Sequence, residues 1–381
     1  MAVDLSTDQA SARAQIHAAL AAGDVVSVLV GPAGSGKTTL MRALLDDIGK
    51  SRPVVLVCPT GKAAARLSEV TGRKASTIHR ALYGRVDSDG VKLTFGARKA
   101  PCPPQGLIVC DEASMVDATL HGDLTAQLPP GAQLLYVGDR EQLPPVRGAW
   151  GPDFSAPTAA LTAIHRQAAD SPIVQLAHAI RTGQPFQGWQ DGACERRVAA
   201  DPVSWLAAEI QSGVDTTLIT ATNKRRTAIN AAVRAALGQG DAPISPGDRL
   251  VNLINQDALG MMNGEVRVVE KAHRAAGPSW MHRAELWEVT LQGGDVIFVN
   301  TDLIGAPVPA FKAWRGRKKH LDRVLHVDYG FCLTVHKAQG SQWTSAGFVS
   351  CPVFRRMSER RRLAYTAVTR AAERLVIFAE R

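Results

Sequence analysis

Short apolar runs alternate with helical stretches over residues 1–170. The runs DVVSVLV, RPVVLVC, GLIVC and AQLLYVG, at 24–30, 52–58, 106–110 and 132–138, are almost continuously apolar. Such runs are typical of strands that are buried on both faces of a parallel sheet. The segments at 37–49 and 61–72 between them have helical apolar spacing. Strands that alternate with helices predict a doubly wound α/β domain.

The same pattern returns in the second half of the chain, with two interruptions in the whole sequence. Residues 171–244 and 326–381 again place a strand before a helix, or a helix before a strand. Residues 84–105 are rich in Gly, Pro and charge, and DSDG within them predicts a small hairpin insertion. Residues 245–325 contain short β runs with Gly turns, which predict an inserted small barrel. We therefore expect a first core over 1–170, a second core over 171–244 and 326–381, and two insertions.

Composition narrows the class of protein. The net charge of +9 and the pI near 9.4 make a polyanionic partner plausible. The six cysteines are scattered without a CxxC pair, so neither a disulfide framework nor a zinc site is expected. Cys58, Cys110 and Cys332 end apolar runs, and we expect them to be buried thiols. No apolar run approaches ~20 residues and the N-terminus does not resemble a signal peptide, so a cytoplasmic protein that does not span a membrane is expected.

The segment GPAGSGKT at 31–38 fits the phosphate-loop pattern GxxxxGK[ST]. It follows a predicted strand and opens a predicted helix, which is the structural context that the motif requires. The backbone of this loop would close around nucleotide phosphates, and Lys37 would reach the β- and γ-phosphates. Thr38 would hold Mg²⁺. The predicted nucleotide-binding set is Gly31, Pro32, Ala33, Gly34, Ser35, Gly36, Lys37, Thr38 and Thr39.

Two further strands end in polar residues. Asp111 and Glu112 follow the run at 106–110, and this acidic pair suits Mg²⁺ binding by Asp111 and activation of water by Glu112. Gln142, in YVGDREQLPPV, could sense the γ-phosphate. The alternatives are a helix cap for the acidic pair and a proline-fixed turn for the second motif. Together with the phosphate loop, these signals predict a nucleoside triphosphatase.

Eight short motifs follow one another along the chain. They are GPAGSGKTT, CPTGKAAARL, ASTIHRAL, DEASM, GDREQLPPV, LTAIHRQ, TVHKAQGSQW and AYTAVTRA. This series resembles the motifs of superfamily 1 helicases, and most of all the 5′→3′ branch that includes RecD and the phage helicase Dda. The resemblance covers the chain from about residue 8 to residue 380.

The resemblance implies a fold and a mechanism. It implies two RecA-like cores that clamp ATP between them, with single-stranded DNA running across both. The hairpin at 84–105 resembles the pin that splits duplex DNA, and residues 245–325 resemble an SH3-like insertion. ATP and Mg²⁺ are the implied cofactors. Single-stranded DNA and forked duplex DNA are the implied partners, together with replication or repair proteins, and the expected active form is a monomer.

The resemblance also assigns residues around the nucleotide. Arg166 in IHRQ and Arg370 in AVTRA would be arginine fingers that stabilise charge on the γ-phosphate. Gln9 resembles the glutamine that reads adenine. Within TVHKAQGSQW, Gln339 and Gly340 would lie near the nucleotide. The family often has Glu at the position of Gln342, so a contact of that residue with sugar is not assigned.

The remaining assignments concern nucleic acid. Hydroxyl, imidazole and ammonium donors suit phosphate oxygens. By the resemblance, these donors are Thr60, Lys62, Thr77 and His79 in the first core and Thr334, His336 and Lys337 in the second. Asn223 also resembles a DNA contact of the second core. The residues of the first core stand ahead of predicted helices, so a capping role is compatible with DNA binding.

Phe95 is the suitable strand aromatic of the hairpin, and by the same resemblance it would meet the fork. The alternative is that it packs the hairpin onto the first core.

The resulting hypothesis is an ATP-dependent DNA helicase that moves 5′→3′ on single strands. The setting would be a bacterial cytoplasm or a phage-infected cell. One alternative is an RNA helicase. Another is a DNA-binding subunit of a nuclease or repair complex that uses ATP only as a conformational switch.

Overall fold

The computed structural model describes residues 4–83, 100–146, 148–164, 170–256, 259–275, 286–316, 321, 323–350 and 356–379. These residues form two compact units. The first contains the described residues up to 194 together with 356–370, and the second contains 195–350 and 371–379.

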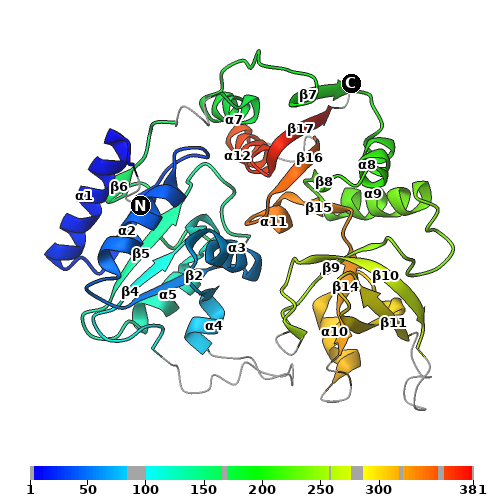
Figure 1. The fold of residues 1–381 in the computed structure, drawn as a ribbon, viewed down its shortest axis with the longest axis horizontal. Coiled ribbons are helices and arrows are strands. Elements are labelled where there is room, and N and C mark those ends of the chain that lie inside the picture. Colours follow the sequence, from blue (N-terminus) through cyan, green and yellow to red (C-terminus); the bar gives the residue numbers. More distant parts are fainter. Residues whose placement is uncertain are drawn as a thin grey trace. The chain divides into compact units, whose positions relative to one another are not determined.

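A six-stranded parallel sheet is the centre of the first unit (Figure 1). Its order is β3-β2-β4-β5-β1-β6, and every paired strand runs parallel to its neighbour. The strands predicted from the four apolar runs are confirmed. The bounds are β1 Val26–Val30, β2 Val54–Cys58, β3 Ala75–Thr77, β4 Leu107–Cys110, β5 Gln133–Gly138 and β6 Ala159–Ala160.

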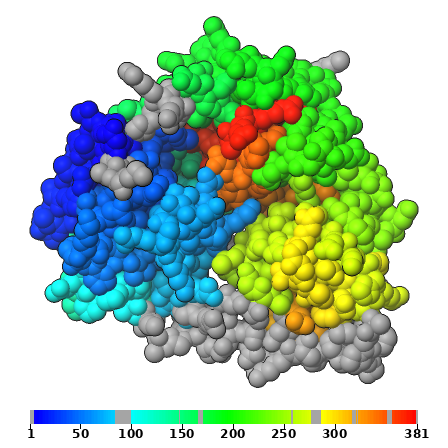
Figure 2. Space-filling view, in the orientation of Figure 1, coloured from blue at the N-terminus to red at the C-terminus, as the bar shows by residue number. Residues whose placement is uncertain are grey.

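Helices cover both faces of this sheet, as the near-continuous apolar strands require. Successive side chains of a strand point to opposite faces, so Leu29 packs with α1, α2 and α3, while Val28 and Val30 pack with α4 and α5. The helices are α1 Thr7–Ala22, α2 Lys37–Ile48, α3 Gly61–Thr71, α4 Ile78–Tyr83 and α5 Ala118–Ala126, with a 3₁₀ turn η1 at Ala113–Met115. Figure 2 shows the blue segments that include α2 and α3 on the exposed surface.

Two further helices of the described residues belong to the first unit. They are α7, Pro172–Thr182, and α12, Met357–Val368, and they pack against each other. In chain order α12 stands between two strands of the second unit, β16 and β17, which pair in parallel. This helix therefore belongs to one unit by its contacts and lies between strands of the other by its place in the sequence.

The second unit contains another parallel sheet, of order β15-β8-β16-β17-β7. Helices α8 and α9 cover one face, where Trp205, Leu206, Ile229 and Val233 pack against the strands. The predicted strand and helix within 216–238 are confirmed. The bounds are β7 Cys194–Val198, α8 Pro202–Gln211, β8 Thr216–Thr220, α9 Asn223–Ala236, β15 Cys332–Thr334, α11 Val335–Ala338, β16 Trp343–Val349 and β17 Ala371–Ala379.

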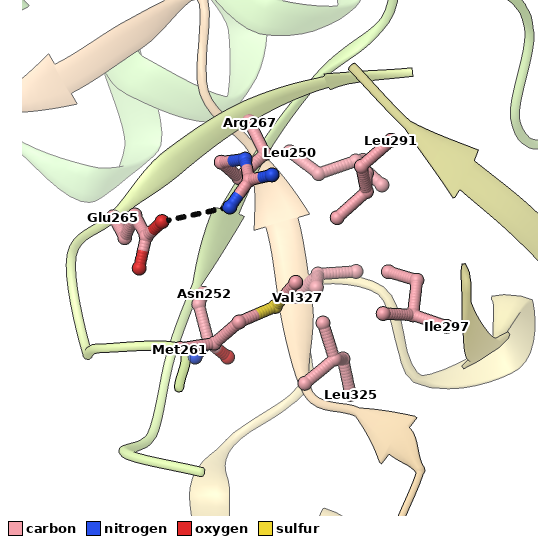
Figure 3. Close-up of a pocket in the computed structure, with 9 residues that line it drawn as sticks. All are labelled: Leu250, Asn252, Met261, Glu265, Arg267, Leu291, Ile297, Leu325 and Val327. Atoms are coloured by element: carbon pink, nitrogen blue, oxygen red, sulfur yellow. Dashed lines mark hydrogen bonds and ion pairs between the residues drawn. The ribbon is translucent and has the colours of Figure 1, made fainter. Parts of the chain in front are cut away.

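A curled mixed sheet of order β13-β12-β11-β10-β9-β14 lies between residues 249 and 329, so its edge strand β14 falls beyond the insertion predicted at 245–325. Its pairings are antiparallel except for the parallel pair β12 and β13. Apolar side chains such as Leu250, Ile297 and Val327 fill its inner side, and Arg267 pairs with Glu265 at 3.2 Å beside them (Figure 3). The elements are β9 Arg249–Asn252, β10 Val266–Arg274, β11 Leu286–Leu291, β12 Val296–Asn300, η4 Thr301–Leu303, α10 Val308–Arg315, β13 Val324–Leu325 and β14 Val327–Tyr329.

Two expectations from composition can be compared with the described residues. Cys58, Cys110 and Cys332 are buried, as predicted, and burial raises the pKa of each thiol. Within the described ranges, no helix is both long enough and apolar enough to span a membrane.

Candidate nucleotide-binding and nucleic-acid-binding sites

The loop at 31–36 leaves β1 and leads directly into α2, which begins at Lys37. Gly34 and Gly36 have φ angles of 78° and 76°, a left-handed conformation that glycine adopts at little cost. Gly36 is the N-cap of α2. The first N–H groups of a helix have no partner within it, and they favour an anion. The sequence therefore builds an anion-binding loop at the carboxyl edge of the sheet.

The loop is held together from inside. The ammonium group of Lys37 donates to the carbonyls of Gly31 and Pro32, at 2.7 and 3.0 Å, and the hydroxyl of Ser35 donates to the Pro32 carbonyl at 2.8 Å. A Cβ atom on Gly31 would lie 2.5 Å from the Ser35 oxygen. Glycine at position 31 is thus required by packing, and Lys37 lies over the loop that it was predicted to serve.

Gln9 lies against this loop. Its side chain is only 1% exposed, and its amide nitrogen donates to the carbonyl of Gly36 at 3.1 Å. Its amide oxygen accepts the N–H of Ser6, and the Ser6 hydroxyl in turn accepts the Gln9 N–H, which makes a capping box at the start of α1. Gln9 therefore joins the first helix to the phosphate loop, whatever its role toward a base.

Asp111 and Glu112 stand directly after β4, at the same edge of the sheet. Burial and the neighbouring charge of Glu112 raise the pKa of Asp111 to about 6, although Lys37 and Arg66 oppose the shift. The Glu112 N–H donates to Asp111 Oδ1 at 2.9 Å. Glu112 has φ 53°, an uncommon conformation for a residue other than glycine. The local strain and the raised pKa both mark this pair as a functional candidate.

Gln142 lies on the turn that follows β5. The turn begins at Asp139, whose carboxylate accepts the N–H of Glu141 at 3.0 Å and whose carbonyl accepts the N–H of Gln142 at 3.2 Å. Gln142 is 6% exposed, and its amide oxygen accepts the Ser114 hydroxyl at 3.4 Å. The turn after β5 is thus linked to the 3₁₀ turn that follows the acidic pair.

Arg370 follows α12 and lies in the first unit with the residues above. Its guanidinium is 6% exposed and donates to the carbonyl of Thr366 at 3.0 Å. Burial lowers the pKa of Arg370, while the charge of Glu112 acts in the opposite direction. The structure therefore brings Arg370 close to Glu112. Arg166, the other predicted arginine finger, and Phe95 of the hairpin lie outside the described residues.

A divalent cation at this site would need phosphate oxygens of a nucleotide in addition to the oxygen ligands of the described residues. Within the described ranges, no group of three or more His, Cys, Asp or Glu side chains is arranged to hold a metal ion. Thr38, in the first turn of α2, and Asp111 supply hard oxygen atoms, and Mg²⁺ typically combines one or two such ligands with phosphate oxygens and water. The donor set fits Mg²⁺ bound with a nucleoside triphosphate.

The candidate DNA contacts of the first unit lie at one edge of its sheet. Strands β2 and β3 are parallel, with Cys58 opposite Thr77, so the residues after them share that edge. Thr60 caps α3 by accepting the Ala63 N–H at 3.2 Å, and Thr77 accepts the Arg80 N–H at 3.1 Å. Lys62 is half-buried in the first turn of α3. The side chain of His79 is exposed on α4. The protein around one side of the ring still removes water from it, which disfavours the charged form and lowers the pKa of the imidazole.

The candidate contacts of the second unit are arranged in the same way. Thr334 ends β15 opposite Thr220, which ends β8, and Asn223 follows β8 as the exposed first residue of α9. Thr334 caps α11 by accepting the Lys337 N–H at 3.3 Å. His336 and Lys337 are half-buried on α11, and burial lowers the pKa of both. Gly340 follows with φ 72°.

The structure adds residues that motif reading did not select. Tyr365 and Thr366 of α12 bond directly to the phosphate loop and to the turn after β5. Arg66 of α3 acts electrostatically on Asp111. AYTAVTRA contains Tyr365 and Thr366, but a buried hydroxyl in a helix gives no local signal of its partner.

Comparisons with known proteins place the chain among helicases. A family model described as an AAA domain matches residues 4–198, and one described as a UvrD-like helicase C-terminal domain matches residues 329–378. The ATP-dependent RecD2 DNA helicase of Deinococcus radiodurans is 33% identical, over 97% of this chain and 48% of the relative. The RecD subunit of the RecBCD enzyme of Mycolicibacterium smegmatis is 30% identical, over 95% of this chain and 69% of the relative.

Solved structures agree on the fold. The crystal structure of Pif1 helicase from Candida albicans matches with a TM-score of 0.58 and 18% identity, over 99% of this chain and 94% of that one. The Pif1 helicase from Bacteroides, solved in complex with ADP-AlF3 and single-stranded DNA, matches with a TM-score of 0.57 and 17% identity, over 98% and 92%. The chain spans about half the length of the RecD2 helicase.

Proposed function

Because the chain belongs to the RecD-like branch of superfamily 1 ATP-dependent DNA helicases, we propose that it is itself such a motor. It hydrolyses ATP, moves 5′→3′ along single-stranded DNA and separates the duplex ahead of it. The observation that carries the proposal is the gathering of Lys37, Asp111, Glu112, Gln142 and Arg370 within one unit, around a phosphate loop.

In this proposal, different residues of the chain have different roles in phosphoryl transfer. The loop at 31–36 and Lys37 bind the phosphates, and Thr38 and Asp111 hold Mg²⁺, which supplies charge neutralisation when bound. Glu112 orients the attacking water and accepts its proton while the bond from the γ-phosphorus to the leaving oxygen breaks. Arg370 and Arg166 stabilise the charge that develops on the γ-phosphate. Gln142 senses that phosphate, and Gln9 reads the base.

The nucleic-acid track follows the sheet edges described above. Thr60, Lys62, Thr77 and His79 grip the backbone of the strand from the first unit, and Asn223, Thr334, His336 and Lys337 grip it from the second. These side chains offer hydroxyl, amide, imidazole and ammonium donors, which suit phosphate oxygens. The net charge of +9 supports a polyanionic partner. Gly340 lies on the nucleotide side of the same motif.

The finer architecture belongs to the same proposal. The two parallel sheets are RecA-like cores and the curled mixed sheet is an SH3-like module. The hairpin predicted at 84–105, of which residues 84–99 lie outside the described part of the chain, is the proposed pin. The domain limits proposed are 1–170, 171–244 with 326–381, and 245–325. The protein acts as a monomer in a bacterial cytoplasm or a phage-infected cell, alongside replication or repair proteins.

A strand-displacement assay tests the proposal. Duplexes with a 5′ tail or a 3′ tail are incubated with the protein, with and without ATP, and ATP turnover is measured with and without single-stranded DNA. We expect displacement of the 5′-tailed substrate only, with ATP, and a strong stimulation of turnover by DNA. Equal turnover with and without DNA, or preference for a matched RNA duplex, would contradict the proposal.

A second candidate is a motor subunit that works only within a larger complex. It is favoured by the relative from Mycolicibacterium smegmatis, which is named as a subunit of the RecBCD enzyme. The isolated chain would then bind ATP and DNA but would turn over ATP only after a partner is added. The same assay therefore distinguishes the two candidates.

A further inference from the structure

Tyr365 places one hydroxyl between two motifs of the nucleotide site. The side chain lies on α12 and is 2% exposed. Its oxygen accepts the backbone N–H of Ala33, in the phosphate loop, at 2.7 Å, and its proton is donated to Asp139 Oδ2 at 2.5 Å. A phenolic hydroxyl offers one donor, and here both its donor and an acceptor site are in use.

Burial and nearby charge keep the Tyr365 hydroxyl protonated in this arrangement. Burial, followed by the charge of Asp139, raises the pKa of Tyr365 well above its ordinary value, so the hydroxyl keeps the proton that it donates. Burial also raises the pKa of Asp139, while Lys37 acts to lower it. Asp139 therefore accepts a hydrogen bond from Tyr365 on α12 and also interacts with the positive charge of Lys37.

The next residue of the helix holds the other end of the same turn. Thr366 is fully buried, and its hydroxyl accepts the N–H of Leu143 at 2.9 Å. Gln142 stands between the two anchor points, Asp139 and Leu143. The carbonyl of Thr366 also accepts from the Arg370 guanidinium at 3.0 Å. One turn of α12 thus contacts the phosphate loop, the turn that carries Gln142 and the proposed arginine finger.

We propose that Tyr365 is a positioning residue of the ATPase site, which fixes the phosphate loop and the Gln142 turn to α12 and thereby sets the position of Arg370. The inference rests on the proposed ATPase function, and it adds the element that links the separate motifs. Nucleotide phosphates at the loop then act on α12 through Ala33 and Tyr365. The same hydroxyl acts on the turn that carries Gln142 through Asp139.

The alternative is that Tyr365 only fills space in the core. Tyr365→Phe separates the two roles, because it keeps the ring and removes the hydroxyl. Tyr136→Phe is the matched control. Tyr136 is fully buried in the same unit, and its hydroxyl bonds to His121 Nδ1 of α5 at 2.9 Å. ATP turnover and melting temperature are measured for both variants and for the unaltered chain.

For Tyr365→Phe we expect kcat to fall about tenfold while KM for ATP changes less than twofold, with a melting temperature similar to that of Tyr136→Phe. We expect Tyr136→Phe to keep its kcat. A normal kcat in Tyr365→Phe would overturn the proposal, and so would equal losses of kcat and melting temperature in both variants. If single-stranded DNA fails to stimulate even the unaltered chain, the helicase proposal fails, while basal kcat still decides the role of Tyr365.

A second pair of variants decides the case if Tyr365→Phe does not fold. Thr366→Ser keeps the hydroxyl that accepts from Leu143, and Thr366→Val removes it while retaining the volume of the side chain. We expect Thr366→Ser to retain kcat and Thr366→Val to lose it about tenfold. Equal kcat values in the two variants would overturn the positioning role of this helix turn.

Discussion

The side-chain amide of Gln9 donates to the carbonyl of Gly36, 3.1 Å away, and so joins α1 to the phosphate loop across 27 positions of sequence. The other end of the same amide accepts the N–H of Ser6. Both the oxygen and the nitrogen of the Gln9 side-chain amide are hydrogen-bonded, and the residue is only 1% exposed. Gln9 therefore supports the shape of the loop directly. Reading a base is an additional role, which requires an atom of this amide to contact the base as well.

Gln9→Ala should raise KM for ATP severalfold, because Gly36 loses its donor and the N-terminus of α2 loses support. Base reading predicts in addition that the loss is greater for ATP than for GTP. Steady-state kinetics with both nucleotides measure the difference. Equal losses would contradict base reading and leave loop support as the function of Gln9.

Lys37→Ala should abolish ATP turnover and leave the fold intact. Within the described residues, the half-buried ammonium group bonds to carbonyls of its own loop, so its removal affects the loop and not the core, and it removes the proposed phosphate ligand. Turnover and thermal melting are the measurements, with Lys50→Ala as control, because Lys50 is exposed just after the same helix. Residual turnover near that of Lys50→Ala would exclude Lys37 from catalysis.

The raised pKa of Asp111 predicts how magnesium activation depends on pH. The carboxyl group titrates at about 6, chiefly because burial and the charge of Glu112 disfavour its ionised form. Mg²⁺ needs the carboxylate, so a proton competes with the metal below that pH. The Mg²⁺ concentration for half-maximal turnover should be flat above pH 7 and should rise toward about tenfold per unit below pH 6. A half-maximal concentration that is constant from pH 5 to pH 8 would remove Asp111 from the metal site.

Much of the fold was predictable because the information is local. β4 is a continuous apolar run, and the phosphate loop carries its glycines at fixed positions in the sequence. β7 gave no such signal, since Glu195, Arg196 and Arg197 are three of its five residues. It is an edge strand, and Glu195 pairs there with Arg374 at 3.1 Å, from a distant segment.

The candidate site shows the same division. Asp111 and Gln142 could be selected because each follows a strand in a recognisable motif. The contact of Tyr365 with Asp139 spans 226 positions, and neither residue has a neighbour that indicates the other. Such a pairing is set by how α12 packs in the first unit, which residue spacing does not record.

Binding to single-stranded DNA should weaken steeply with salt, because the proposed contacts are mainly with phosphates. Each neutralised phosphate releases roughly 0.7 counterion on a single strand. Lys337→Ala should therefore reduce the slope of log affinity against log salt by about one contact. Lys271→Ala, at an exposed position of β10, should leave the slope unchanged. A flat salt response, or the same slope in both variants, would contradict backbone binding by Lys337.

Phe95→Ala should separate ATPase activity from unwinding. Stacking of a base on an aromatic ring contributes roughly 1–3 kcal/mol, comparable to one base-pair step of DNA, so loss of the ring should slow strand separation. DNA-stimulated turnover should survive. Both rates are measured on one preparation, with Trp189→Ala as a control for a partly exposed aromatic at 38%. Normal unwinding would exclude Phe95 from the fork. Parallel loss of turnover, unwinding and melting temperature would indicate a packing role.

The position of α12 in the sequence affects when the first unit can finish folding during synthesis on the ribosome. The first unit needs this helix, yet about 160 residues of the second unit are synthesised between residue 194 and its arrival. At about 5–20 residues per second, that interval is on the order of ten to thirty seconds. Until then Asp139 and Leu143 lack the hydroxyls of Tyr365 and Thr366. The first unit therefore stays incomplete until α12 has been synthesised.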